Sequence, residues 1–596
     1  MRRRPRGIRA VNRTGNRTAN RAGIKAWTAA VGLAVVAALL PPLGTAAPAH
    51  AENNGVGLTP ALGWSSWSSV RKDPTAAKID AQADAMKSSG LAAAGFQYVN
   101  VDDFWYQCPG SQGPNVDANG RWVTDATKFP PSGSANGIKA AADHVHADGL
   151  QFGLYVTPGV SKQAVAQNSA ILGTSYHVQD IATTTAEKNY NCKGMVGIDY
   201  SKPGAQAFIN SWADEFAAWG VDYVKIDGVG TPDVPDVQAW SKALVQTGRP
   251  IHLELSNNLA IGSASTWQQY ANGWRTGGDI ECYSSCPTAG TLTDWAHVQS
   301  RFGQVASWQP DGGPGAFNDY DSLEVGNGSG TGLTDAEQQS QMSLWALAAS
   351  PLILGTDLTS LNATELGYLK NGRVLAVDQD AIDASRIVNS GNQQVYSKKE
   401  KDGAVVIGLF NYSDTGSTTV SVPLSAAGTS GGTATDLWSG ASLGTVSGTY
   451  SVTLGPGAVK LIKVVPGGGG GSVTIEAEAA GNTIAGAARV ATCAACSGGH
   501  KVGYIGNGAA NYVTVNGITE PSAGSHTLTF AYLVSGTRSF SISVNGGPDI
   551  VENLTGTSFA TPATASVTVQ LDAGANTIKF HNDTAYAPDL DAITVS

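Results

Sequence analysis

Two aspartates, Asp227 and Asp279, end short apolar segments of the sequence and are candidates for carboxyl chemistry. Two carboxyl groups separated by about 5–5.5 Å can cleave a glycosidic bond with retention, because one attacks the anomeric carbon while the other protonates the leaving oxygen. A single aspartate at a strand end is often only the N-cap of the next helix. The pair therefore needs a scaffold that brings both side chains to one place.

The segments that must position these aspartates alternate with helical patterns from about residue 62 to 358. Lys202–Gly220 and Asp335–Ser350 are amphipathic helices by their apolar spacing. The predicted strands are Leu62–Trp67, Tyr98–Asp103, Phe152–Thr157, Tyr223–Asp227, Ile251–Ser256, Trp274–Ile280, Phe317–Glu324 and Pro351–Gly355. Eight βα units predict a (β/α)8 TIM barrel, whose active site lies at the C-terminal ends of its strands.

The helical period disappears after about Asp378, and antiparallel strands are predicted at Gln394–Ser397, Gly403–Asn411, Thr418–Val422 and Ala458–Val465. Five glycines after Pro466 indicate a flexible linker. The alternating pattern that follows, strongest in Ala510–Val515, His526–Leu533 and Ser539–Val544, favours a β-sandwich. We therefore expect a signal peptide at 1–51, a TIM-barrel domain at 52–378, an antiparallel β-domain at 379–466, a linker at 467–472 and a β-sandwich module at 473–596.

The N-terminus has the pattern of a cleaved secretory signal. Five arginines lie within the first nine residues, an apolar run covers Ala26–Leu40, and Ala49-His50-Ala51 fits a cleavage site. The alternative, a membrane anchor, is disfavoured because this run is shorter than the ~20 residues that span a bilayer. We expect a secreted, extracellular protein, and no later segment is long and apolar enough to cross a membrane.

Charge and cysteine content narrow the possible partners. Without residues 1–51 the chain keeps 28 basic and 47 acidic residues, a net charge of −19. Nucleic acid is excluded, since phosphate binding needs a basic surface. The six cysteines can oxidise in an exported chain, with Cys282–Cys286 and Cys493–Cys496 as local pairs and Cys108 and Cys192 as possible partners. Zinc binding by the local pairs is disfavoured because no histidine neighbours them at ligand spacing.

Motifs at six consecutive strand ends resemble glycoside hydrolase family 27, which includes α-galactosidases and α-N-acetylgalactosaminidases. The resemblance covers roughly residues 57–465, including the antiparallel domain. Gly63–Trp67 resembles the family's GWNSW, Asp102–Trp105 its DDCW, Gly153–Tyr155 its GIY, Lys225–Asp227 its KYD, Trp274–Asp279 its WRxxxD and Asn318–Asp321 its NDPD.

This resemblance implies that Asp227 is the nucleophile and Asp279 the general acid/base, with no catalytic cofactor. It also implies that Asp102 and Asp103 grip sugar hydroxyls. Lys225 points to the same side of its strand as Asp227 and favours the ionised nucleophile. The further substrate-binding residues that we expect are Trp64, Tyr155, Ser256, Arg275 and Asp319. Ordinary packing is the alternative for the aromatic residues, and a structural salt bridge is the alternative for Arg275.

Departures from the family pattern concern the choice of sugar. Glu254–Asn258 replaces the segment that reads the 2-position, and Phe104 replaces a cysteine. The retained Asp102 and Asp103 favour a terminal α-D-galactoside, because an axial O4 and a C6 hydroxyl supply donors for two acceptors. β-L-Arabinopyranosidase and isomalto-dextranase activities are alternatives. A non-catalytic sugar-binding barrel is disfavoured by the intact set of charged residues. The expected partners are galactose- or arabinopyranose-containing glycans, and the oligomeric state is not predicted.

The last module resembles carbohydrate-binding families 6 and 35 through Ile475–Glu478 and Asp589–Ile593. This resemblance implies a structural Ca²⁺ held by Glu476, Glu478 and Asp591. The alternative is that these acids are solvated residues at a sheet edge. Residues expected to touch a glycan are Tyr504, Tyr512 and Asn582.

Overall fold

The computed structural model describes residues 54–466, 473–520 and 523–595. The predicted signal peptide and glycine linker lie outside the described residues, so both stay predictions. Within the described part of the chain, no helix combines the length and the apolar character needed to cross a membrane.

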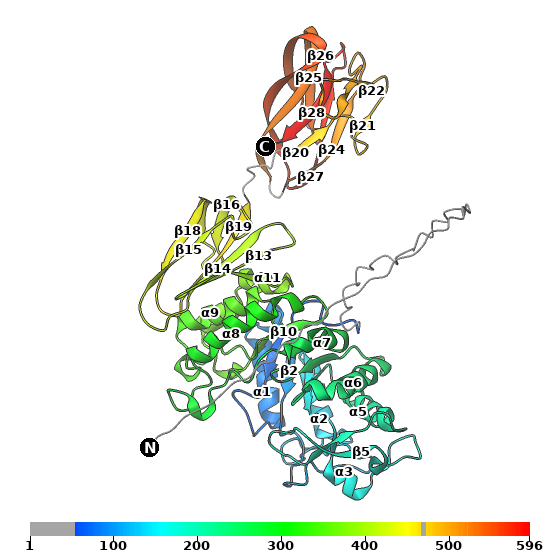
Figure 1. The fold of residues 1–596 in the computed structure, drawn as a ribbon, viewed down its shortest axis with the longest axis vertical. Coiled ribbons are helices and arrows are strands. Elements are labelled where there is room, and N and C mark those ends of the chain that lie inside the picture. The colour runs from blue at the N-terminus through cyan, green and yellow to red at the C-terminus, as the bar shows by residue number, and fades with distance from the viewer. Residues whose placement is uncertain (1–53, 467–472, 521–522, 596) are drawn as a thin grey trace, which may run out of the picture. The chain divides into compact units, whose positions relative to one another are not determined.

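Eight parallel strands form one curled sheet, surrounded by helices (Figure 1). The order is β10-β9-β8-β7-β3-β2-β1-β11, and a parallel bridge between Leu323 and Leu354 closes it. The strands are β1 Leu62–Ser65, β2 Tyr98–Val101, β3 Gln151–Val156, β7 Tyr223–Ile226, β8 His252–Leu255, β9 Gly273–Arg275, β10 Phe317–Asp319 and β11 Leu352–Leu354. All eight predicted strands are present, mostly shorter than predicted, and the predicted TIM barrel is confirmed.

The helices cover the barrel through their apolar faces. In α5 (Ala205–Trp219), the side chains of Phe208, Trp212 and Phe216 are buried. The second predicted helix is α9 (Asp335–Leu347), which begins with a capping box between Thr334 and Glu337. The other main helices are α1 Ala76–Ser88, α2 Gly137–Ala147, α6 Val234–Gln246, α7 Ala264–Tyr270, α8 Trp295–Trp308, α10 Ala363–Leu369 and α11 Gly372–Gln379.

A small subdomain is inserted between β3 and α5, where the sequence analysis predicts no strands. It contains a three-stranded sheet in the order β4-β6-β5, together with two short helices. Its elements are β4 Val160–Ser161, α3 Lys162–Gln167, α4 Val178–Ile181, β5 Ala182–Glu187 and β6 Met195–Ile198. The Cys108–Cys192 disulfide ties this insertion to the loop after β2. The local pairs Cys282–Cys286 and Cys493–Cys496 are also bonded.

The antiparallel domain that follows consists of a six-stranded sheet and a two-stranded sheet. Tyr396 and Phe410 belong to the same apolar core as the barrel, and the Tyr396 hydroxyl donates to the Phe302 carbonyl of α8 at 2.6 Å. The strands are β12 Ser385–Ser390, β13 Gln393–Lys399, β14 Val405–Asn411, β15 Thr418–Pro423, β16 Gly431–Asp436, β17 Ser442–Ser447, β18 Thr449–Leu454 and β19 Val459–Pro466.

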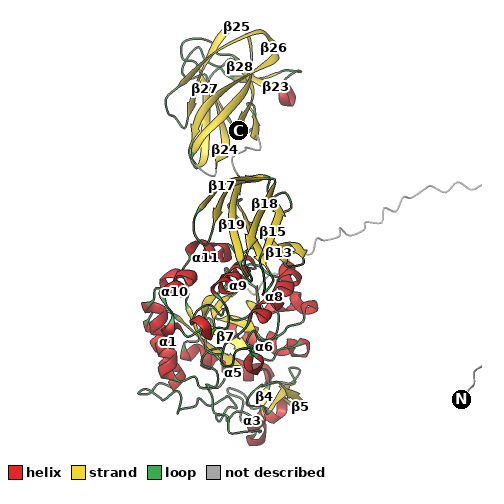
Figure 2. Ribbon diagram, turned by 90° about the vertical axis from the view of Figure 1, so that its left-hand side faces the viewer, coloured by secondary structure: helices red, strands yellow, loops and turns green. Residues whose placement is uncertain are grey.

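The C-terminal module is antiparallel and has its own core around Phe530, Phe540 and Phe580. The segments His526–Leu533 and Ser539–Val544, which read as two strands, are one long strand, β25 (Gly524–Val544), with a register shift near Tyr532. The other strands are β20 Val473–Glu476, β21 Thr483–Ile484, β22 Arg489–Thr492, β23 His500–Gly503, β24 Val513–Glu520, β26 Ile550–Leu571, β27 Gly574–His581 and β28 Asp589–Val595. Figure 2 shows that helices belong almost entirely to the barrel and that the later residues are strands. The predicted β-sandwich is confirmed.

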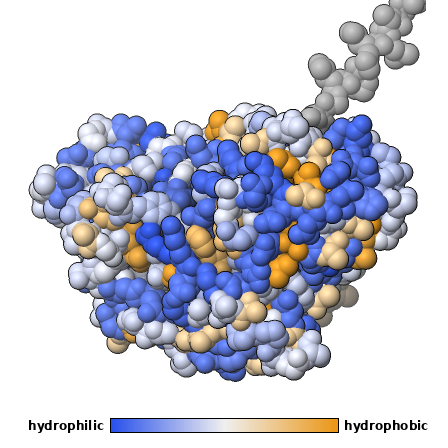
Figure 3. All heavy atoms as spheres, turned by 90° about the horizontal axis from the view of Figure 1, so that it is seen from below, coloured by the Kyte–Doolittle hydropathy of each residue, from blue (hydrophilic) through white to orange (hydrophobic). Residues whose placement is uncertain are grey.

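The molecular surface in Figure 3 is mostly hydrophilic, with apolar side chains scattered in small groups. Single exposed apolar residues are normal on a globular protein. This face therefore gives no sign of a large apolar docking surface.

Candidate active site

Three barrel strands deliver the carboxyl groups of the candidate site. Asp102, Asp227 and Asp279 follow the C-terminal ends of β2, β7 and β9. In the sheet register, Lys225 of β7 pairs with Tyr155 of β3 on one side and with Glu254 of β8 on the other. Because side chains two residues apart in a strand share a face, Lys225 and Asp227 both point toward the barrel axis.

A pocket of about 410 Å³ opens at these strand ends. Both catalytic candidates line it together with Asp102, Asp103 and Lys225, so the structure brings these five predicted residues together. Its full lining consists of Trp67, Arg71, Lys72, Asp102, Asp103, Tyr190, Asn191, Lys225, Asp227, Asn257, Asp279 and Tyr283.

Asp227 is held by its own strand and by Tyr155. Its backbone N–H donates to the Val156 carbonyl at 2.8 Å, and the Tyr155 hydroxyl lies 3.3 Å from its Oδ2. Burial raises the pKa of the Asp227 carboxyl to about 6, although the positive charge of Lys225 opposes this shift. The nearby carboxyls of Asp102 and Asp279 also raise this pKa. Asp227 and Asp279 are thus close enough to influence each other's ionisation.

Asp279 accepts a donor on each of its two oxygens. Tyr283 donates its hydroxyl to Oδ2 at 2.6 Å, while Arg275 (3.2 Å) and Asn257 (3.3 Å) donate to Oδ1. Burial raises the pKa of Asp279, but the Arg275 charge and the Tyr283 hydrogen bond outweigh it and bring the pKa to about 2. Tyr283, Arg275 and Asn257 therefore hold Asp279 as a carboxylate.

Asp102 and Asp103 form a buried acidic pair with separate partners. Lys225 Nζ lies 2.7 Å from Asp102 Oδ2. Asp103 accepts from the Tyr106 hydroxyl at 2.7 Å and from Asn191 Nδ2 at 2.8 Å. Burial raises the pKa of Asp103, whereas these two hydrogen bonds lower it. The pair presents fixed acceptor oxygens, which suit the hydroxyl groups of a sugar.

Five of the predicted substrate-binding residues lie outside this pocket lining, namely Trp64, Tyr155, Ser256, Arg275 and Asp319. Trp64 is fully buried, with its indole N–H donating to the Thr356 carbonyl at 2.8 Å, so it packs in the core. Ser256 is buried and its backbone bonds to Ile226 and Val229, while its side chain lowers the pKa of Asp227. Arg275 and Asp319 line a small cavity of about 40 Å³ deeper in the barrel. Arg275 also forms ion pairs with Asp279 and Asp321.

Tyr155 also lies outside the pocket lining, since it is buried, but its hydroxyl reaches Asp227 directly. It supports Asp227, the predicted nucleophile, through this contact. Its position agrees with the expectation that it belongs to the site, although packing accounts for its ring.

Several pocket residues escape the sequence analysis. Trp64 lies within β1 and is buried, whereas Trp67 follows the end of β1 and lines the pocket. Both belong to the same sequence motif, so only the position of the strand end distinguishes the pocket residue from the core residue. Tyr190 and Asn191 belong to the insertion. The one sequence feature that could have indicated them is the neighbouring Cys192, whose disulfide ties this segment to the loop after β2. Asn257 directly follows Ser256, and Tyr283 directly follows Cys282.

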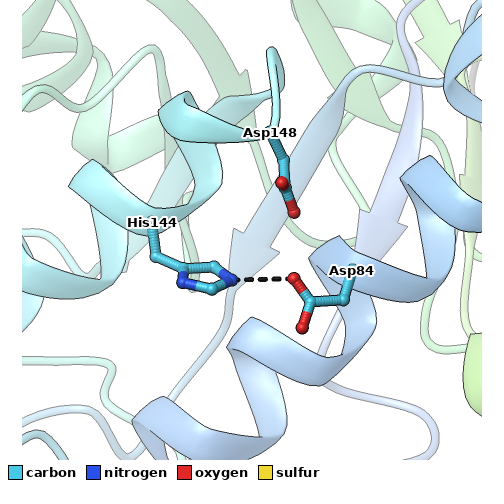
Figure 4. A group of neighbouring side chains, drawn as sticks. All are labelled: Asp84, His144 and Asp148. Carbon is cyan, nitrogen blue, oxygen red and sulfur yellow. Dashed lines mark hydrogen bonds and ion pairs between the residues drawn. The ribbon is translucent and has the colours of Figure 1, made fainter.

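Two groups among the described residues combine side chains that ligate metals. In the first, on α1 and α2, His144 Nε2 lies 2.9 Å from Asp84 Oδ1 and Asp148 is adjacent (Figure 4). Lys87 Nζ lies 2.8 Å from Asp148 Oδ1, so protein groups already pair these charges. In the second group, Asp279 with Glu281 and Asp321, Arg275 forms ion pairs with Asp279 and Asp321.

Three acidic residues gather in the C-terminal module, where the sequence predicts calcium. Glu476 Oε2, Glu478 Oε2 and Asp591 Oδ1 are buried and have no hydrogen-bond partner among the described residues. Ser497 donates its hydroxyl to Glu476 at 2.5 Å and its backbone N–H to Asp591 at 3.2 Å. Buried carboxylate oxygens without partners have the chemistry that Ca²⁺ requires.

The family model described as "Alpha galactosidase A" matches residues 59–191 and 189–380, and the model for the "Alpha galactosidase C-terminal beta sandwich domain" matches 390–464. The chain belongs to glycoside hydrolase family 27. The predicted family is thereby confirmed, and the protein is a glycoside hydrolase that has the TIM barrel and antiparallel domain of this family.

Relatives in this family include two curated α-galactosidases. That of Cyamopsis tetragonoloba is 32% identical over 426 residues, which covers 70% of this chain and 89% of the relative. Alpha-galactosidase A of Cellvibrio japonicus is 31% identical over 64% of this chain and 83% of its own length.

Solved structures of the family are also similar. A β-L-arabinopyranosidase from Geobacillus stearothermophilus has a TM-score of 0.64 and 31% identity, covering 70% of this chain and 98% of that one. α-Galactosidase I from Mortierella vinacea has a TM-score of 0.55 and 26% identity, covering 70% and 99%.

Proposed function

We propose that this protein is a secreted, retaining exo-glycosidase that removes terminal α-D-galactosyl residues from oligo- or polysaccharides. The observation that carries the proposal is that Asp102, Asp103, Asp227 and Asp279 line one pocket at the C-terminal end of the barrel. Two of these carboxyls suit bond cleavage, and the other two suit hydroxyl recognition. Curated α-galactosidases at about a third identity support the same substrate class.

The reaction follows from the roles proposed for the two catalytic carboxyls. The Asp227 carboxylate attacks the anomeric carbon, the electron pair of the glycosidic bond passes to the leaving oxygen, and this oxygen takes the proton of Asp279. The Asp279 carboxylate then removes a proton from water, and the water oxygen displaces Asp227 from the sugar. Two inversions retain the configuration, and Asp279 regains its proton for the next cycle.

The choice of galactose depends on the buried pair Asp102 and Asp103. Each is nearly inaccessible, so a substrate that lacks the matching hydroxyl loses a hydrogen bond to a charged acceptor, which is worth about 1.5–3 kcal/mol. A pentopyranose lacks the C6 hydroxymethyl group. The similarity to the G. stearothermophilus arabinopyranosidase nevertheless makes β-L-arabinopyranosidase activity the second candidate.

The deciding experiment compares 4-nitrophenyl α-D-galactoside with the corresponding β-L-arabinopyranoside. We expect the galactoside to have the higher kcat/KM; equal or faster hydrolysis of the arabinoside would replace the first proposal by the second. Asp227→Ala removes the nucleophile, and we expect kcat to fall by at least about 10³-fold. The control is Asp143→Ala, which removes an exposed carboxyl of α2 that pairs with Lys139. Unchanged activity of Asp227→Ala would exclude the proposed mechanism.

We also propose that the C-terminal module binds glycan and holds a structural Ca²⁺ through Glu476, Glu478 and Asp591. The unpartnered carboxylate oxygens support this proposal. Free Ca²⁺ at about 100 times its Kd should stabilise the folded module by about 2.7 kcal/mol. Thermal unfolding with Ca²⁺ or with a chelator tests this, and Asp591→Asn should remove most of the difference. Identical unfolding in both conditions would contradict the calcium site.

Secretion is part of the proposal. Three disulfides support it, because disulfides persist in oxidising compartments. The mature protein in the culture medium should begin after Ala51, which N-terminal sequencing can test.

A further inference from the structure

Tyr283 contacts the proposed acid/base directly, and its surroundings suit a movable contact. Its hydroxyl donates to Asp279 Oδ2 at 2.6 Å and accepts from the Trp67 indole N–H at 2.8 Å. The Arg71 guanidinium lies over its ring, 4.7 Å from the centroid. Although its hydroxyl is held at both sides, the residue as a whole is 39% exposed.

The loop that carries Tyr283 is short and closed covalently. The Cys282–Cys286 disulfide joins two residues whose Cα atoms are 4.8 Å apart, and Tyr283 follows the first cysteine with a left-handed φ of 47°. Cys282 itself is buried and bonds through its backbone N–H to the Leu292 carbonyl at 3.1 Å. The loop therefore presents the tyrosine from a fixed base while its ring stays at the pocket wall.

The two oxygens of Asp279 are not equivalent. Oδ1 faces Arg275, a buried guanidinium that cannot lose its charge and that Asp321 fixes from the other side. A proton on Oδ1 would face this permanent donor. Oδ2 faces the Tyr283 hydroxyl, which can rotate or withdraw. Oδ2 is therefore the oxygen that can deliver a proton to a leaving group. The Tyr283 hydroxyl bonds this same oxygen.

We propose that Tyr283 is a positioning residue that occupies Asp279 Oδ2 in the resting enzyme and is replaced there by the leaving-group oxygen of the substrate. The inference rests on the proposed acid/base role of Asp279. Entry of the glycoside exchanges the tyrosine for the glycosidic oxygen. Asp279 takes a proton from solvent as this donor leaves and gives it to the leaving oxygen during bond cleavage. In the second half-reaction Asp279 takes a proton from the attacking water, and after the sugar departs this proton passes to solvent and the carboxylate bonds Tyr283 again.

The charged surroundings of Asp279 agree with this switch. The groups that influence its ionisation from the packed elements are cationic Arg275 and Lys225, the carboxyls of Asp227, Glu281 and Asp321, and the hydroxyls of Tyr283 and Tyr190. Burial and the Glu281 and Asp279 carboxyls raise the pKa of Tyr283, so the phenol keeps its proton and remains a donor. Among these groups, Tyr283 both bonds Asp279 directly and has a solvent-exposed side chain, so it is the one that a substrate can replace.

Tyr283→Phe tests the proposal, because it removes the hydroxyl and keeps the ring. The pH dependence of kcat/KM is measured for wild type and variant with methyl α-D-galactoside, whose leaving group needs a proton. Asp279 has the lower pKa of the two carboxyls, so its titration sets the acidic limb. Loss of the Tyr283 hydrogen bond raises this pKa, and we expect the acidic limb of the variant to lie about one to two pH units higher, the size expected for losing a hydrogen bond to an ionised group. With 4-nitrophenyl α-D-galactoside, whose leaving group needs little protonation, the rate near the pH optimum should change less than twofold.

Tyr176→Phe is the matched control, since Tyr176 is exposed to the same extent as Tyr283 (39%) and lies outside the pocket lining. Its acidic limb should coincide with that of the wild type. A second variant, Cys282→Ser with Cys286→Ser, frees the loop and should shift the limb in the same direction as Tyr283→Phe.

An unshifted acidic limb in Tyr283→Phe, or an equal shift in Tyr176→Phe, would overturn the inference. The proposed function fails separately, if the wild type hydrolyses neither substrate.

Discussion

At the scale of single residues, the site contains two carboxyls whose surroundings separate their proton affinities. Burial raises the pKa of Asp227 to about 6, whereas Arg275 and Tyr283 overcome burial and lower the pKa of Asp279 to about 2. In the proposed mechanism, the active form carries one proton, on Asp279, and a negative charge on Asp227. Since the two groups interact, the pair titrates as a unit, and the reactive microstate is populated only while one proton is present.

This leads to a prediction for the pH profile. For a glycoside with a poor leaving group, kcat/KM should be highest between about pH 3 and 6, because the pair loses its last proton as the pH rises through about 6. Above this value the rate should fall about tenfold per pH unit. A rate that stays constant up to pH 9 would show that neither carboxyl limits the reaction in this way.

The sequence predicts the charged residues of the site better than its walls. The charged residues lie at or after the ends of predicted strands: Asp102, Asp103, Lys225, Asp227 and Asp279. The predicted strands therefore place them at one end of the barrel, and the family resemblance assigns their roles. Wall residues such as Tyr190 and Tyr283 come from loops of irregular conformation. Their contacts depend on disulfide geometry and long-range packing, which local periodicity does not encode.

At the scale of elements, close packing between β1 and β2 makes Gly63 structurally important. A Cβ at Gly63 would lie 2.5 Å from the Tyr98 carbonyl oxygen and 2.7 Å from the Tyr98 Cβ. Backbone atoms in the middle of a barrel cannot move aside easily. A side chain at this position has no room, so the strand requires glycine here. The same residue begins the motif that ends at Trp67.

We expect Gly63→Ala to lower the free energy of unfolding by about 1–3 kcal/mol, the usual cost of overpacking a core. Chemical denaturation of the purified variant gives this number. Gly303→Ala is the control, because Gly303 lies inside α8 with no atom within 4 Å of the added Cβ. This control should be neutral or stabilising by up to about 1 kcal/mol. Equal stability of the two variants would mean that the barrel relaxes around the new methyl group.

The elements themselves are largely predictable because barrel strands are short apolar runs and their helices have one apolar face. The insertion between β3 and α5 is the main exception. Strand β5, Ala182–Glu187, is rich in threonine and carries no buried run, so it pairs through its backbone without a hydrophobic signal. The long β25 was read as two strands because its register shift near Tyr532 interrupts the alternation.

At the scale of the whole molecule, apolar cores divide the described chain. The core around Phe530 contains only residues of the C-terminal module, whereas the barrel and the antiparallel domain share the cluster that includes Tyr396. Every residue that lines the candidate pocket lies between Trp67 and Tyr283. Chemistry and the proposed glycan binding therefore belong to segments that do not share a core.

This division predicts the behaviour of a protein that ends at Pro466. Because the shared core and the pocket remain complete, kcat/KM for 4-nitrophenyl α-D-galactoside should stay within about twofold of the full-length value. On an insoluble galactose-containing polymer the truncated protein should be slower by about tenfold or more, since a tethered binding module raises the local concentration of the enzyme at the polymer. The full-length Asp591→Asn variant separates the two contributions, because it keeps the chain length while removing a proposed calcium ligand. If the truncated protein loses activity on the small substrate as well, the C-terminal module contributes to the catalytic fold and not only to polymer binding.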